Sequence, residues 1–244
     1  MATSTTANPL HIAVVGGGLS GTLVVVHLLR QSPAGTQISL IERTPPVGRG
    51  VAYGTECADH LLNVPAARMS AFADEPNHFF NWISERVGRL GYPDQVAPSD
   101  FLPRKLYGDY ISSVFTEARA KASDSIRFSN VTGELTDIEE RPDGKARLLL
   151  TDGRTLDADR VVLALGVLPG EYPIRRSLPF YHGRRYVHVP WNPDVLAGIG
   201  KEQDVLIVGA GLTATDIIVQ LDRLGHRGTV HALSRRGLRP RPHV

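Results

Sequence analysis

Hydrophobic and polar positions near the start of the chain follow two different periods. "HIAVV" (His11–Val15) is a short apolar run, typical of a buried parallel strand. In "SGTLVVVHLLRQ", apolar residues at 23, 26, 28 and 29 have helical spacing, and "PAG" at 33–35 ends the helix. "TQISLIER" then predicts a second strand that reaches Glu42. The pattern therefore predicts one strand–helix–strand unit of a parallel sheet.

The same order recurs near the other end of the chain. Val205–Val208 predicts a strand, Thr213–Leu224 a helix with Gly225 as its stop, and "GTVHALSRR" the next strand. The two units are too far apart to be neighbours in a solenoid repeat. The pattern therefore predicts two separate strand–helix–strand units of the nucleotide-binding kind.

Between these units, the pattern predicts a β-meander over residues 131–158. Val131–Glu140 and Lys145–Thr151 are the expected strands, joined by "RPDG", and "TDGR" begins a third. A buried strand over Arg160–Leu165 and the bend "GVLPG", which includes Gly166 and Pro169, follow. Taken alone, this segment fits an ordinary hairpin followed by a strand as well as it fits a meander with a returning strand.

Residues 43–110 are rich in loops. "PNHFFNWI" predicts a helix that buries Phe79, Trp82 and Ile83, and "GDYISSVFTEARAKA" predicts a second helix. Loops of this length after a nucleotide unit more often cover a ligand than lie idle.

Composition narrows the class of protein. The chain is 42% hydrophobic and 21% charged, with a net charge of +2, too small to favour nucleic acid or a membrane surface as partner. Cys57 is the only cysteine, which excludes an intramolecular disulfide, a Cys-x-x-Cys pair and a thiolate zinc cluster. The histidines lack metal-ligand spacing, so no metal is predicted. Without a secretory signal or an apolar run of membrane-spanning length, a cytoplasmic enzyme is expected.

The first unit carries the dinucleotide fingerprint Gly-x-Gly-x-x-Gly at Gly16, Gly18 and Gly21. The first glycine permits a tight turn, the second lets a pyrophosphate approach, and the third allows close packing of helix and strand. Amides of the helix N-terminus, at Leu19 and Ser20, would face the phosphates. Glu42 ends the second strand and would accept hydrogen bonds from a ribose diol. The alternative is a glycine turn without a ligand.

The second unit differs at the position of the acid. Its turn carries Gly209 and Gly211, with Thr213 at the start of the helix and Ala214 in place of the third glycine. Where the first unit has Glu42, this unit has "SRR", Ser234–Arg236, a hydroxyl and guanidinium groups that would accept a ribose 2′-phosphate. We therefore expect FAD or NAD in the first unit and NADPH in the second, with NADH possible. A solvated basic loop is the alternative.

Further candidates lie in the loops, each with a structural alternative. Asn63 is the candidate catalytic residue, as a flavin contact, or else it caps a turn. Arg104 either contacts the FAD phosphate or the substrate, or forms a surface ion pair. His188 and Trp191 either lie at the junction of nicotinamide and flavin, or are a hydrogen-bonded histidine and a packed tryptophan. The other candidates either contact a cofactor or stabilise loops: Arg43, Arg49, Gly50, Ala52, Tyr53 and Gly166.

The motifs "RGVAYGT", "HLLNVPAARMSAF", "FLPRKLYGDY", "YVHVPW" and "LIVGAGLTATD…SRRG" together resemble the FAD/NAD(P)-binding family that includes flavin-dependent urate hydroxylases and aspartate N-monooxygenases. The resemblance covers residues 10–243. It implies FAD in the first unit and NAD(P)H in the second. It also implies that reduced flavin reacts with oxygen to give a flavin hydroperoxide, which oxygenates a small polar substrate. Family members usually continue further, so the resemblance implies a C-terminally truncated chain.

The sequence thus predicts an α/β protein with two Rossmann-like units and a meander, in the three-layer β/β/α arrangement of flavoproteins. The expected parts are a disordered arm (1–9), an FAD-binding domain (10–170), a connecting segment (171–200) and an incomplete NAD(P)-binding domain (201–244). The expected function is an FAD-dependent, NAD(P)H-using monooxygenase. The alternative is a non-catalytic or truncated nucleotide-binding module.

Overall fold

The computed structural model describes residues 9–86, 88, 95–168, 178–191 and 193–241. The chain divides into two compact units, one formed by Met1–Thr55 with Val64–Gly166, the other by Glu56–Asn63 with Val167–Val244. Residues 1–8 of the expected arm, Pro169, and residues 171–177 of the expected connecting segment lie outside the described residues.

A parallel sheet of four strands forms the centre of the first unit. Its strands lie in the order β3 (Arg127–Thr132), β2 (Gln37–Glu42), β1 (His11–Val15) and β7 (Arg160–Leu163). The central strands are apolar because both of their faces are covered, and Ala13, Val14 and Leu40 are fully buried. The predicted strands at 11–15 and 36–43 are confirmed, whereas the strand expected over 160–165 ends at Leu163.

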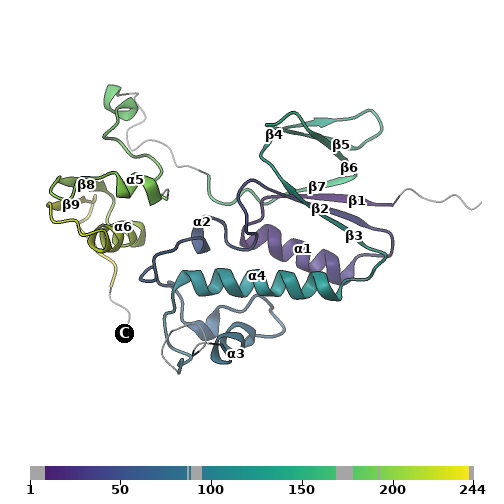
Figure 1. The fold of residues 1–244 in the computed structure, drawn as a ribbon, viewed down its shortest axis with the longest axis horizontal. Helices are drawn as coiled ribbons and strands as arrows, with labels where there is room; N and C mark the ends of the chain where they lie inside the picture. Colours follow the sequence, from purple (N-terminus) through teal and green to yellow (C-terminus); the bar gives the residue numbers. More distant parts are fainter. Residues whose placement is uncertain (1–8, 87, 89–94, 169–177, 192, 242–244) are drawn as a thin grey trace, which may run out of the picture. The chain divides into compact units, whose positions relative to one another are not determined.

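Helices α1 (Leu19–Gln31) and α4 (Arg104–Lys121) lie side by side along one face of this sheet (Figure 1). The helix α1 buries Thr22, Val25, Val26 and Leu29, the stripe expected of an amphipathic helix. The loop-rich part of the unit adds the short elements α2 (Gly50–Tyr53), η1 (Ala66–Arg68) and α3 (His78–Ser84).

The helix α3 packs its aromatic residues against α4. Phe79 and Ile83 are fully buried, as predicted, whereas Trp82 is only half-buried. The indole Nε1 of Trp82 donates to Ser113 Oγ on α4 (3.2 Å), which satisfies the polar group of this half-buried ring.

The antiparallel meander covers the other face of the sheet. It consists of β4 (Leu135–Glu140), β5 (Ala146–Leu150) and β6 (Thr155–Ala158), in this order. Its buried Leu148, Leu150 and Ala158 form one core with residues of β1 and β2. Meander, parallel sheet and helices are the three layers of the predicted fold class, which is confirmed for this unit (Figure 1).

The single strand predicted over residues 131–140 is wrong. Residues 127–132 form β3, an edge strand of the parallel sheet, and the meander begins only at Leu135. The chain leaves the parallel sheet at Gly133, whose N–H donates to the carbonyl oxygen of Glu42 (3.1 Å). Apolar alternation continues on both sides of this glycine, so the pattern did not reveal the change of sheet.

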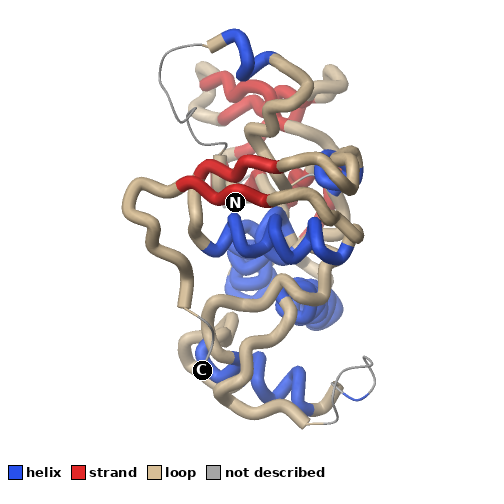
Figure 2. Tube along the Cα trace, turned by 90° about the vertical axis from the view of Figure 1, so that its left-hand side faces the viewer, coloured by secondary structure: helices blue, strands red, loops and turns tan. Residues whose placement is uncertain are grey.

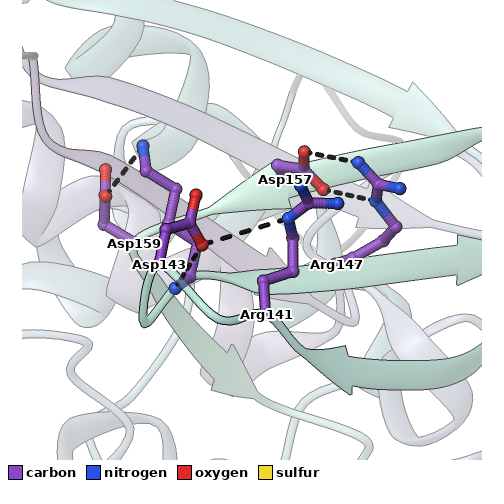
Figure 3. Close-up of polar contacts among 6 residues, drawn as sticks. Arg141, Asp143, Arg147, Asp157 and Asp159 are labelled. Atoms are coloured by element: carbon purple, nitrogen blue, oxygen red, sulfur yellow. Dashed lines mark hydrogen bonds and ion pairs between the residues drawn. The ribbon is translucent and has the colours of Figure 1, made fainter.

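Ion pairs line the outer surface of the meander (Figure 3). Arg147 makes two hydrogen bonds to Asp157 across β5 and β6, from Nε to Oδ1 (2.7 Å) and from Nη2 to Oδ2 (2.9 Å). Lys145 Nζ lies 3.0 Å from Asp159 Oδ1, and Asp159 Oδ2 also accepts the backbone N–H of His11 (2.8 Å). Asp159 thus ties the end of the meander to the start of β1.

The second unit contains two parallel strands, β8 (Val205–Val208) and β9 (Val230–Leu233), with α6 (Leu212–Arg223) beside them (Figure 2). The elements η3 (Pro179–His182) and α5 (Pro193–Ala197) precede β8. The segment Glu56–Asn63 belongs to this unit as well. Its buried His60 donates from Nε2 to the backbone oxygen of Asp216 (3.0 Å), and Asp59 pairs with Arg223, both on α6.

Within the described residues, no helix is both long and apolar enough to span a membrane.

Candidate nucleotide-binding sites

The first glycine turn joins β1 to α1 in a conformation that only glycine allows. Gly16 has a φ of +99°, and a Cβ at this position would collide with the carbonyl oxygen of Ala164. Its N–H donates to the carbonyl oxygen of Ile41 (2.8 Å), which holds the turn against the end of β2. A Cβ at Gly21 would collide with the carbonyl oxygen of Gly16, so α1 packs directly on the turn. Two glycines of the fingerprint are therefore required by backbone packing.

Gly18 has a different role, because it caps the N-terminus of α1. The first backbone hydrogen bond of the helix runs from Thr22 N to Gly18 O (3.0 Å), so the amides of Leu19, Ser20 and Gly21 precede the helical ladder. The first turn contains no acidic residue. This end of α1 therefore presents backbone donors and the positive end of a helix dipole, an arrangement that suits a phosphate.

The carboxylate of Glu42 is fixed beside the same turn. Oε2 accepts the N–H of Gly17 (2.5 Å) and Oε1 accepts the N–H of Thr44 (2.8 Å). A carboxylate has about four acceptor positions, so two backbone donors leave capacity for a diol. The arrangement fits the role predicted for Glu42 toward a ribose.

The segment Val47–Gly54 lies against the glycine turn. Gly48 N–H donates to Gly17 O (2.7 Å), and a Cβ built on Gly18 would lie 3.6 Å from Gly50 Cα. The backbone of Gly50, and not an open surface, therefore borders Gly18 on this side. Ala52, which follows in α2, is exposed.

Arg49 is held by α4, since Nη2 lies 2.6 Å from Asp109 Oδ1, with 23% and 28% of the two side chains exposed. Of the two interpretations of Arg49, its structure supports that of a loop anchor. Tyr53 stacks at a tilt on Tyr107, with ring centroids 4.8 Å apart. Burial raises the pKa of Tyr53, and the positive charge of Arg104 partly offsets this rise.

Arg43 forms an exposed ion pair with Glu134. Its Nη1 lies 3.0 Å from Glu134 Oε1, and the two side chains are 65% and 51% exposed. The prediction that Arg43 binds a cofactor gains no support from this ion pair.

The second glycine turn repeats the geometry of the first. Gly209 has a φ of +117° and donates its N–H to Leu233 O (2.7 Å), as Gly16 does to Ile41 O. Gly211 caps α6 with ψ −168°, the value found at Gly18. Around Gly209 and Gly211, a Cβ would meet no other atom within 4 Å, so this turn is open.

Thr213 and Ala214 lie in the first turn of α6, and Ala214 is buried. It occupies the place of Gly21. The N–H of Thr215 bonds to Gly211 O (3.2 Å), as Thr22 does to Gly18 O. A methyl group thus takes the place of the third glycine without breaking the helix start.

Ser234 corresponds to Glu42 in the structure. Ile41 and Leu233 accept the hydrogen bonds of the two turns, and the next residue is Glu42 in one unit and Ser234 in the other. Ser234 is half-buried, and the guanidinium groups after it are exposed. Among the described residues none of these arginines forms an ion pair: Arg235, Arg236, Arg239 and Arg241.

The remaining candidates are placed as follows. Asn63 is exposed and its side chain makes no hydrogen bond to a described residue, so it does not cap the following turn. Gly166 follows β7 with a φ of +70°, and a Cβ built on it would meet no atom within 4 Å beyond its chain neighbours. Trp191 is 45% exposed, contrary to the packed alternative, and His188 Nδ1 lies 3.2 Å from the hydroxyl of Tyr186. Cys57 is half-buried.

Over the described residues, no cluster of three or more histidine, cysteine or acidic side chains could hold a metal ion.

Sequence reasoning missed the residues of α4 that hold the Val47–Gly54 segment. Asp109 binds Arg49, and Ser112 Oγ donates to Val47 O (2.8 Å). The helix predicted from Gly108 onward begins four residues earlier, at Arg104, so Gly108 lies inside α4. A glycine inside a helix has a packing reason when it is kept there, and this was the available signal. Ala164, against Gly16, was also missed as part of the turn.

The three-layer unit and the two glycine turns define a protein of the two-dinucleotide-binding class. Residues 13–168 match the family model described as FAD-NAD(P)-binding, and the chain belongs to this family.

Two curated relatives illustrate the match. Nitrosuccinic acid synthase npaA of Aspergillus oryzae is 25% identical over 255 residues, which covers 95% of this chain and 38% of the relative. Flavin-containing monooxygenase 1 of Mus musculus is 26% identical over 234 residues, which covers 88% of this chain and 38% of the relative. The chain thus spans well under half the length of these relatives.

Solved structures share the fold. A closed structure of cyclohexanone monooxygenase aligns with a TM-score of 0.57 at 18% identity, over 92% of this chain and 38% of that chain. S-allyl-L-cysteine S-oxygenase from Allium sativum aligns with a TM-score of 0.54 at 18% identity, over 95% and 52%. These similarities confirm the predicted α/β dinucleotide-binding fold class.

Proposed function

We propose that this chain is the nucleotide-binding part of an FAD-dependent, NADPH-using monooxygenase, with FAD at the first glycine turn and NADPH at the second. The observation that carries the proposal is the equivalence of Glu42 and Ser234 in two turns of the same geometry. A carboxylate suits an unmodified ribose diol and repels a 2′-phosphate, whereas a hydroxyl followed by guanidinium groups attracts one.

The residues around the first turn fit FAD. Glu42 would bind the ribose of the adenosine half, and the amides of Leu19, Ser20 and Gly21 would bind the pyrophosphate. Bound flavin would supply the hydride and oxygen chemistry, which no side chain of the site has to provide. Asn63 stays the candidate that the sequence gives for a polar contact of the flavin ring, and its side chain is exposed.

The residues of the second turn fit NADPH. Gly209, Gly211, Thr213 and Ala214 form the open turn at the start of α6, and Ser234 with Arg235 and Arg236 would bind the 2′-phosphate. A guanidinium presents paired donors that match phosphate oxygens.

Molecular oxygen and a small polar molecule are the proposed substrates. A relative that aligns over 95% of this chain is named a nitrosuccinic acid synthase, and nitrosuccinic acid is itself small and polar. This similarity supports the specific resemblance to aspartate N-monooxygenases more than that to urate hydroxylases. A cytoplasmic location is also proposed, because a chain with a single cysteine forms no intramolecular disulfide of the kind found in secreted proteins.

A second candidate function is a nucleotide-binding module that does not turn over by itself. It is favoured by one observation, namely that the chain spans 38% of the relatives npaA and flavin-containing monooxygenase 1. In that case, a complete substrate pocket would need residues outside the aligned region.

One experiment separates these functions. The purified chain is reconstituted with FAD and its flavin absorbance is recorded, and NADPH oxidation is then followed under air. A yellow protein that oxidises NADPH supports the enzyme. A yellow protein that does not react with NADPH supports the module, and a chain that binds no FAD contradicts both.

A further inference from the structure

We propose that Asp109 is a positioning residue for the FAD pyrophosphate, acting through Arg49 and the Val47–Gly54 segment; the inference rests on the proposed binding of FAD at the first glycine turn. No role was assigned to Asp109 by the motifs, and it lies on α4, in a different element from the fingerprint. All residues involved belong to the first compact unit.

The segment is held between the glycine turn and α4. On one side, Gly48 N–H donates to Gly17 O (2.7 Å), and a Cβ on Gly50 would lie 3.1 Å from Gly18 Cα. The position of Gly50 therefore determines how much space remains beside Gly18, where a pyrophosphate is expected.

On the other side, three residues of α4 hold the segment. Ser112 Oγ donates to Val47 O (2.8 Å), and Asp109 Oδ1 binds Arg49 Nη2 (2.6 Å). A Cβ on Gly108 would lie 2.6 Å from the carbonyl oxygen of Tyr53 and 3.1 Å from Arg49 Cγ, so glycine is needed for this approach. Gly108 and Ser112 are one helical turn apart and share a face of α4.

The ion pair is better explained by positioning than by stability. Both side chains are about three-quarters buried, at 23% and 28% exposure, and the cost of removing such charges from water offsets much of their attraction. What the pair supplies is a fixed direction for Arg49, and thereby for Gly50, the next residue. Asp109 accordingly fixes the wall of the phosphate site before the ligand arrives.

Asp109→Asn tests the positioning role, because positioning and bulk electrostatics predict opposite changes in the affinity for FAD. The substitution raises the net charge by one next to an anionic ligand, so bulk electrostatics alone would tighten the binding of FAD. Positioning predicts the opposite, a dissociation constant for FAD about tenfold higher, the effect of one lost charge-assisted hydrogen bond. Asp157→Asn is the matched control, because it makes the same charge change and breaks the Arg147 ion pair on the meander.

The affinity is measured by titrating flavin-free protein with FAD and following fluorescence quenching, and the melting temperature of each apoprotein is measured alongside. We expect Asp109→Asn to lower the apoprotein melting temperature more than Asp157→Asn, because it removes one charge of a largely buried pair, and to weaken FAD binding at temperatures where the apoprotein is still fully folded. Asp109→Glu, which keeps a carboxylate, is expected to stay within about threefold of wild type. Ser112→Ala removes a second contact of the same segment and is expected to weaken FAD binding several-fold.

The inference is overturned if Asp109→Asn binds FAD as tightly as Asp157→Asn, or if Asp109→Glu loses as much affinity as Asp109→Asn. It is also overturned if unfolding of the apoprotein accounts for the whole loss. Failure of wild type and Asp157→Asn alike to bind FAD would instead contradict the proposed function and, with it, this inference.

Discussion

Glu42 and Ser234 occupy the same position in two copies of one turn, because Ile41 and Leu233, directly before them, accept the hydrogen bonds of Gly16 and Gly209. The backbone frame of the two turns is nearly the same, with φ values of +99° and +117° at the two glycines. The chemical difference between the turns therefore resides in the side chains that follow the second strand of each unit.

Replacing Arg235 by Glu tests the assignment of the second turn. We expect the dissociation constant of NADPH to rise at least about tenfold and that of NADH to change little, because only NADPH carries the 2′-phosphate. Equilibrium titration of both nucleotides measures the effect. Arg227→Glu reverses an exposed cation, paired with Glu202, elsewhere in the same unit and is the control. Equal losses for the two nucleotides would contradict the assignment.

Replacing Gly21 by Ala tests the packing of α1 on the first turn. The added methyl group collides with the carbonyl oxygen of Gly16, and overpacking of this kind costs about 1–3 kcal/mol of unfolding free energy. Denaturant unfolding measures it. Gly211→Ala adds the same methyl group where no atom lies within 4 Å, so it should lose only the preference for glycine over alanine at this N-cap, less than about 1 kcal/mol. Alanine has a higher helix propensity than glycine and restricts the unfolded chain more, so both of these effects favour the variant; a Gly21→Ala protein at least as stable as wild type would therefore contradict the collision.

Much of the first and second units was predictable, because the sequence patterns that indicate their strands, helices and glycine turns are local. The period of the apolar positions indicated β1, α1, β8 and α6, and the glycines with Glu42 indicated the first turn. Each of these features depends on residues within one βαβ unit. Ser234 was also predictable as the counterpart of Glu42, because each residue lies at the end of the second strand of its own βαβ unit.

What could not be predicted depends on contacts between distant segments. The strand β3 joins the parallel sheet through pairing with β2, such as Ile38 with Phe128, and no local pattern distinguishes this from pairing in a meander. The contact of Arg49 with Asp109 likewise joins residues on different elements. The exposure of Trp191 could not be deduced, since a tryptophan in sequence is usually expected to pack.

The stability of the first unit should depend on pH through Asp159. The N–H of His11, and then Lys145, hold the pKa of this carboxyl below its ordinary value of 3.8. A lowered pKa means that the folded state favours the carboxylate, so the contribution is complete above pH 3.8 and is lost as the pH falls below it.

Asp159→Asn is therefore expected to lower the unfolding free energy at pH 7 by about 1 kcal/mol, with a gap that narrows as the pH falls below 3.8. Urea unfolding at several pH values measures the gap. Asp124→Asn, which changes an exposed aspartate in the α4–β3 connection, should show no gap. A constant difference between wild type and Asp159→Asn at every pH would contradict the role of charge.

Asn63→Ala tests the proposed flavin contact. The side chain is exposed and bonds to no described residue, so stability should change by less than about 0.5 kcal/mol. Any loss of flavin affinity or of NADPH oxidation then reports on the site directly. Thermal unfolding of the apoprotein and titration with FAD are the two measurements. Unchanged affinity and unchanged NADPH oxidation would remove Asn63 from the site.

The exposed arginines after β9 have a consequence for kinetics. Arg235, Arg236, Arg239 and Arg241 concentrate positive potential at one end of the second unit, without described carboxylates to neutralise it. Such a potential speeds the diffusional encounter with polyanions and is screened by salt over about 8–10 Å at physiological ionic strength. At the proposed NADPH site, the association rate should therefore fall as salt is added, and the dissociation rate should change much less.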